Sequence, residues 1–235
     1  MKDNTREKVG GLCSILLGVS YVLVGALYLV LPVDQRSAPT DLAFYTSVLQ
    51  SPGLLRIYYL MFALGAVLGL GVVPAISERM QSVHEGWVRW TANLAFLGFA
   101  VTAIDFFKVW AIQVYRAEIF VNGDASTQAA ISATSDGLDP QGWLSFGMVG
   151  AWVLAVSLLA LRENLWPKSL SYAGIALASI YWLIVVGFVF GIDILLSIAA
   201  ALGGVVLAPI WYIWAGFRLR QAEQVERAQV LNPVP

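Results

Sequence analysis

The sequence predicts an all-α protein, a polytopic bundle of six transmembrane helices with both ends of the chain in the cytoplasm. Three observations support this prediction. First, 59% of the 235 residues are hydrophobic and 12% are charged, whereas an average soluble domain is about half apolar and about a quarter charged. Second, six stretches reach the length of about 20 mostly apolar residues that a helix needs to cross a bilayer. Third, lysine and arginine gather in alternate connections between these stretches.

The six apolar stretches are predicted to be helices rather than strands. Strands of a membrane barrel are about half as long and alternate polar with apolar residues, a pattern that these stretches lack. We expect the whole chain, 1–235, to form a single integral membrane domain that ends in a charged cytoplasmic tail at 218–235. The predicted helices cover residues 9–31, 54–76, 88–114, 142–161, 170–190 and 194–217.

The distribution of positive charge predicts the orientation. Ten lysines and arginines lie at the two ends of the chain and in the second and fourth connections: Lys2, Arg6, Lys8, Arg79, Arg89, Arg162, Lys168, Arg218, Arg220 and Arg227. Three lie in the other connections: Arg36, Arg56 and Arg116. Because loops rich in lysine and arginine stay in the cytoplasm, both termini are expected there.

The two longer connections are expected to face outward. In the first, 32–53, an amphipathic segment predicts a short helix lying along the membrane surface; its apolar residues are Leu42, Phe44, Tyr45, Val48 and Leu49. The second, 117–142, is predicted to be mobile or weakly helical. Its acids are expected to be solvated; they are Glu118, Asp124, Asp136 and Asp139. The short connection "FGID" at 190–193 predicts a tight helical hairpin.

Small residues spaced four apart suggest where helices approach each other closely. The pairs are Gly65 with Gly69, Gly187 with Gly191, and Ser14 with Gly18. Such pairs suit internal packing, a homo-oligomer or a protein partner equally well. The remaining expected partner is the lipid bilayer.

Several kinds of chemistry are not expected. His84 is the only histidine and Cys13 the only cysteine, so a bis-histidine haem and an intrachain disulfide are excluded. No zinc-binding or hydrolase motif is present, and the net charge of −1 implies no attraction to nucleic acid. We expect no metal, no cofactor and no enzymatic activity.

The stretch "AIDFFKVWAIQVYRAE" at 103–118 places charges in or just beyond the third predicted helix. At about 1.5 Å per residue, Asp105 lies about 25 Å and Lys108 about 30 Å along this helix, toward the outer side of a hydrocarbon layer about 30 Å thick. Being three residues apart, their charged groups can meet. The candidate polar cluster within the membrane comprises Thr102, Asp105, Lys108, Arg116 and Arg56.

Two interpretations of this cluster stay open. Asp105 and Lys108 can form a structural ion pair with the lysine reaching toward water, or they can line an outward-facing polar pocket for a small ligand. In either case the polar stripe is expected to face protein rather than lipid.

The chain resembles the small multi-pass membrane proteins of bacteria that are grouped as domains of unknown function. The likeness is carried by "REKVGGLCSILLGVSYVLVGALYLVL" at 6–31 and "APIWYIWAGFRLR" at 208–220. The resemblance implies a bacterial inner-membrane location and brings no activity with it. Two alternative functions stay open. The protein is expected to be either a non-enzymatic membrane component or accessory subunit, or a small transporter or ligand sensor that uses the pocket around Asp105 and Lys108.

Overall fold

The protein is a bundle of long helices. The computed structural model describes residues 5–36, 41–134 and 137–231, and over these residues all regular structure is helical. Six helices in the described part are long and apolar enough to cross a membrane, which confirms the predicted fold class. They are Glu7–Val30, Pro52–Met80, Gly86–Asn122, Trp143–Arg162, Lys168–Phe190 and Asp193–Gln221.

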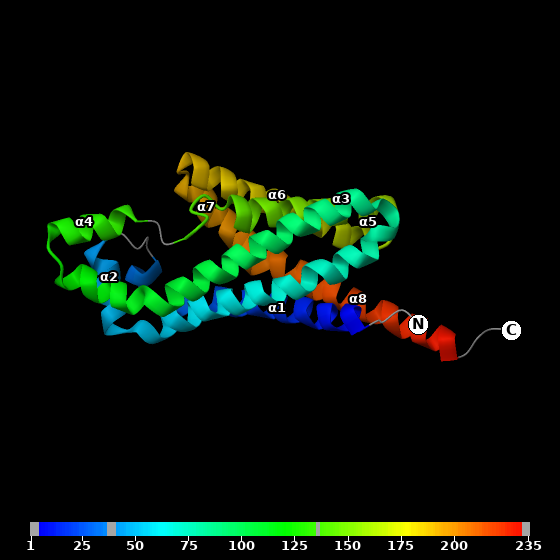
Figure 1. The fold of residues 1–235 in the computed structure, drawn as a ribbon, viewed down its shortest axis with the longest axis horizontal. Helices are drawn as coiled ribbons and strands as arrows, with labels where there is room; N and C mark the ends of the chain where they lie inside the picture. Colours follow the sequence, from blue (N-terminus) through cyan, green and yellow to red (C-terminus); the bar gives the residue numbers. More distant parts are fainter. Residues whose placement is uncertain (1–4, 37–40, 135–136, 232–235) are drawn as a thin grey trace.

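The first crossing is α1 (Thr5–Val30), and the second and third are the two halves of α3 (Pro52–Asn122). These two halves are antiparallel, because the backbone of His84 leaves the helical conformation (φ −156°, ψ 75°) and the chain reverses there (Figure 1). The connection expected around 77–87 is therefore helical on both sides of one sharp bend.

The third crossing extends to Asn122, beyond the predicted end at residue 114. Its extension is stabilised by packing, because Ala117 and Phe120 are buried against α2 (Leu42–Gln50). The ring of Phe120 stacks on that of Tyr45 with centroids 4.1 Å apart.

The expectation of a surface-lying helix at 42–49 was correct about the helix and wrong about its position. Asp41 caps α2 by accepting a hydrogen bond from the backbone N–H of Phe44 at 2.8 Å. The apolar face of α2 is buried against α3 rather than presented to a membrane surface, since Phe44, Tyr45 and Val48 are almost fully buried. Of the predicted apolar face, Leu42 is exposed.

The second long connection contains a short helix, α4 (Ala125–Ala133). Asp124 caps it by accepting hydrogen bonds from the N–H of Thr127 and the hydroxyl of Ser126. These bonds stabilise the carboxylate and lower the pKa of Asp124 to about 2. Asp136, also expected in this connection, lies outside the described residues.

The last three crossings follow as π-helical η2 (Trp143–Met148) with α5 (Val149–Arg162), then α6 (Lys168–Phe190), then α7 (Asp193–Ala200), π-helical η3 (Ala201–Leu207) and α8 (Ala208–Leu231). The hairpin expected at 190–193 is present, with Gly191 in the left-handed conformation (φ 63°). The π segment η3 precedes Pro209. In a regular α-helix a proline ring clashes with the carbonyl group four residues earlier, and a π segment there changes the local geometry.

Five of the six paired small residues contact other parts of the chain, whereas a Cβ on Gly191 would meet nothing within 4 Å. Ser14 donates to the backbone oxygen of Tyr212 in α8 at 2.6 Å, and a Cβ on Gly18 would meet Ile213 at 2.5 Å. Equivalent Cβ atoms would meet Ser20 from Gly65 and Leu196 from Gly187. These faces are therefore used inside the chain.

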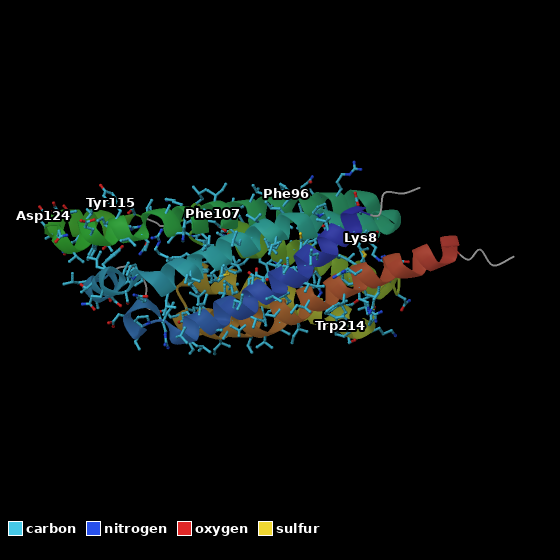
Figure 2. All side chains as sticks on the ribbon, turned by 90° about the horizontal axis from the view of Figure 1, so that it is seen from below. Lys8, Phe96, Phe107, Tyr115, Asp124 and Trp214 are labelled. Carbon is cyan, nitrogen blue, oxygen red and sulfur yellow. The ribbon has the colours of Figure 1, made fainter. Side chains whose placement is uncertain are left out.

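Different elements gather at the two ends of the molecule. Figure 1 shows the start of α1, the bend of α3 and the last part of α8 at one end, called here the terminal end, and α2 and α4 at the other, called the α4 end. Figure 2 shows Lys8 at the terminal end and Tyr115 and Asp124 at the α4 end. Lys2 and residues 232–235 of the predicted tail lie outside the described residues.

Candidate functional site

A cavity of about 760 Å³ lies between α1, both halves of α3, η2 and α6, and the segment after α4 lines part of it. Its lining combines aromatic rings, hydroxyl groups and charged side chains. These three kinds of group occupy different parts of it.

The aromatic residues form two walls. On α3, the rings of Phe62 and Phe106 are stacked with centroids 4.4 Å apart, and Tyr59 lies 6.1 Å from Phe106. The second wall comes from other elements. The ring centroid of Phe146 in η2 lies 5.9 Å from that of Tyr181 and 6.4 Å from that of Phe188, both on α6. Close contact between the two halves of α3 therefore builds one wall, and contact between η2 and α6 builds the other.

Hydroxyl groups line the part of the cavity that lies deepest in the bundle. Tyr21 of α1 and Tyr181 of α6 each lie about 14 Å from the α4 end of their helix, at about 1.5 Å per residue. Ser20 and Thr102 also line the cavity; Ser20 donates to the backbone oxygen of Met61 and Thr102 to that of Gly98. These four residues supply hydroxyl groups at this depth, and the hydroxyls of Tyr21 and Tyr181 also interact with each other.

Two carboxylates lie nearer the α4 end. Asp105 Oδ1 accepts a hydrogen bond from the backbone N–H of Leu138 at 2.8 Å. Asp139 Oδ2 accepts from the N–H groups of Leu144 and Ser145, in the first turn of η2, at 2.8 and 2.7 Å. Both side chains line the cavity and also position the chain that encloses it.

Arg116 lies further toward the α4 end. One guanidinium nitrogen donates to the carbonyl oxygen of Ile131 at 2.6 Å and to the carbonyl and hydroxyl oxygens of Thr134 at 3.2 Å. These are groups at the C-terminus of α4, where a cation is favourable. Arg116 also lies near Tyr45 of α2: burial raises the pKa of the Tyr45 hydroxyl, and the guanidinium opposes that rise.

The structure divides the polar cluster that the sequence suggests. Thr102, Asp105 and Arg116 line the cavity. Lys108 is exposed and does not contribute to the lining, and Arg56 is exposed with its guanidinium 5.3 Å from the ring centre of Trp110. The described hydrogen bond of Asp105 is with Leu138 rather than with Lys108, and the pairing of Asp105 with Lys108 stays a prediction.

The sequence interpretation missed the phenylalanines of the site and the hydroxyl groups of Tyr21 and Tyr181. Tyr21 and Tyr181 carried a signal, since a tyrosine far from both ends of a spanning helix places a hydroxyl in hydrocarbon. The phenylalanines carried none, because a phenylalanine facing a cavity and one facing lipid look alike in sequence. Among the described residues, no three histidine, cysteine or acidic side chains are grouped to hold a metal ion.

Comparison with known proteins gave one family. A family described as a domain of unknown function, DUF4386, matches residues 10–216. Neither the comparison with curated proteins nor that with solved structures gave a significant match. The match covers all six crossings almost completely, and it confirms the resemblance to uncharacterised multi-pass membrane proteins. The chain belongs to the DUF4386 family.

Proposed function

We propose that this protein binds a small amphipathic molecule within the membrane and acts, without catalysis, as a carrier or sensor of that molecule. The observation that supports the proposal is the cavity of about 760 Å³. This volume falls in the range of about 300–1,000 Å³ that small-ligand sites occupy. Its mostly aromatic walls with a few polar groups are also typical of such sites.

The distribution of lysine and arginine suggests in which half of the membrane the cavity lies. Apart from Lys2, which lies outside the described residues, the lysines and arginines assigned to the cytoplasm lie at the terminal end or in connections that return to it. The cavity lies toward the α4 end. Under the positive-inside rule the site therefore belongs to the outer half of a bacterial inner membrane.

Binding is favoured over catalysis by what the polar groups do. The described bonds of Asp105, Asp139 and Arg116 hold backbone groups of the surrounding chain. Side chains committed in this way shape and orient a pocket, and they suit recognition of charge or polarity in a ligand.

Adjacent phenylalanines offer a direct test. Phe106 lines the cavity, while Phe107 is exposed on the outside of α3 (Figure 2). We expect the purified protein to bind at least one of three aromatic probes saturably: tetraphenylphosphonium, tetraphenylborate or triphenylphosphine oxide. Phe106→Ala should weaken that binding about tenfold, equivalent to about 1.4 kcal/mol, whereas Phe107→Ala should leave it unchanged.

Equilibrium dialysis against protein-free micelles measures this binding. Failure of all three probes to saturate, or equal effects of the two substitutions, would contradict the proposal. Intact copurification of a protein partner, together with insensitivity to both substitutions, would favour an accessory subunit instead.

A further inference from the structure

We propose that the ligand is an organic cation with an aromatic or aliphatic body, and that Asp105 is its counter-ion. This inference rests on the proposed binding function and names the chemical class of the ligand. It is carried by the charges at the α4 end of the cavity, by the rings beside them and by the geometry of the Asp105 carboxylate.

Among the residues that the structure describes, the charged groups that line the cavity carry a net negative charge. They are two carboxylates, Asp105 and Asp139, and one guanidinium, Arg116. The guanidinium is engaged with the carbonyl oxygens at the end of α4. It also lies about 16 Å further along α3 than Asp105, at about 1.5 Å per residue. A ligand among the aromatic walls therefore lies nearer to the carboxylate of Asp105 than to the guanidinium of Arg116.

The aromatic walls favour the same sign of charge. The faces of aromatic rings are electronegative and attract cations, most strongly where water is excluded. Phe106 belongs to the same helical turn as Asp105, and its partner Phe62 is stacked on it. A cationic group near Asp105 would thus interact with both a carboxylate and ring faces, and an anionic group would be repelled by both.

One oxygen of Asp105 is turned toward a residue that has no side chain. Oδ1 accepts the hydrogen bond from Leu138. Oδ2 lies 3.0 Å from the position that a Cβ on Gly137 would take, and both residues line the cavity. A side chain at 137 would crowd this oxygen, and glycine avoids that contact; Oδ2 is the atom we assign to the ligand's positive charge.

A matched pair of ions tests the sign of charge in the wild-type protein. Tetraphenylphosphonium and tetraphenylborate have nearly the same shape and opposite charges. We expect the phosphonium to bind about tenfold or more tightly than the borate, as measured by equilibrium dialysis corrected with protein-free micelles. Equal binding, or tighter binding of the borate, would overturn the inference.

Substitution of the carboxylate tests the role of Asp105. Asp105→Asn should weaken phosphonium binding about tenfold and change binding of neutral triphenylphosphine oxide by less than about twofold. Asp124→Asn is the matched control, because Asp124 is an exposed acid that caps α4 and asparagine caps helices equally well. It should change neither affinity.

The outcomes separate this inference from the proposed function. Saturable binding of the neutral probe without preference for the cation would leave the binding function standing and would refute the cation. Loss of neutral and cationic binding together in Asp105→Asn would refute the counter-ion role. If that variant does not fold, the comparison of phosphonium with borate in the wild-type protein still decides the question.

Discussion

Gly174 shows how closely the helices of this bundle approach one another. A Cβ at this position of α6 would lie 2.0 Å from Ser157 Oγ on α5 and 2.4 Å from Trp211 Nε1 on α8. Neither of those two polar atoms has a hydrogen-bond partner among the described residues, and both are buried. The contact therefore depends on shape rather than on hydrogen bonding, and only glycine fits it.

We expect Gly174→Ala to destabilise the protein by about 1–3 kcal/mol, the usual effect of overpacking a well-filled core. Gly204→Ala is the control, because its added Cβ would meet nothing within 4 Å. Thermal unfolding in detergent measures both. A Gly174→Ala protein as stable as the wild type would show that α5, α6 and α8 can separate at no cost.

At the scale of elements, α3 organises the α4 end of the molecule. Its extension beyond residue 114 packs against α2 through Ala117 and Phe120, and Arg116 holds the C-terminus of α4. Neither contact requires the membrane. The same helix therefore carries cavity-lining residues within the bundle and positions the chain outside it.

Replacement of Arg116 should loosen α4. Charge-assisted hydrogen bonds contribute about 1.5–3 kcal/mol when buried, and this one is partly exposed, so we expect Arg116→Gln to raise hydrogen exchange of the α4 amides about tenfold. Arg56→Gln is the control on the same helix, because Arg56 lies over Trp110 and has no described contact with α4. Equal exchange in the two variants would contradict the role given to Arg116.

At the scale of the whole molecule, six crossings place the start of α1 and the last part of α8 at the same end (Figure 1). The side of the membrane on which that end lies is predicted from charge alone. The four clusters of lysine and arginine assigned to the cytoplasm outnumber the residues on the other side by ten to three.

Reporter fusions test this orientation. A reporter inserted at Thr127 in α4 should be active outside the cytoplasm, and one at the C-terminus should be active inside it. Activity of both reporters on the same side would be incompatible with the three crossings that lie between α4 and the C-terminus.

Much of the fold could be predicted because its causes act locally. Each spanning helix is recognised by a run of about 20 apolar residues. The turn at Gly191 is recognised by its position between two such runs. The end of the third crossing could not be predicted in the same way. Beyond residue 114 the helix is stabilised by α2, a segment distant in sequence, so no local pattern marks where it stops.

The candidate site was predictable only where polar or charged side chains, such as Thr102, interrupt an apolar helix. Asp105 and Arg116 stand out in an apolar chain, and both line the cavity. Lys108 stands out equally and does not line the cavity. Residues three apart on a helix point in directions about 60° apart, so Lys108 and Asp105 have different neighbours.

By itself the sequence determined that this protein crosses a membrane with six helices, because hydrocarbon requires every backbone polar group to be bonded within its own helix. Tertiary structure alone decided which side chains face a cavity and which face lipid. Phe106 and Phe107 are identical residues next to each other, yet one lines the cavity and the other is exposed. Lipid tails are as apolar as the interior of the bundle, so no contrast of polarity distinguishes the two faces, and only the packing of α1, α3, η2 and α6 around the cavity does.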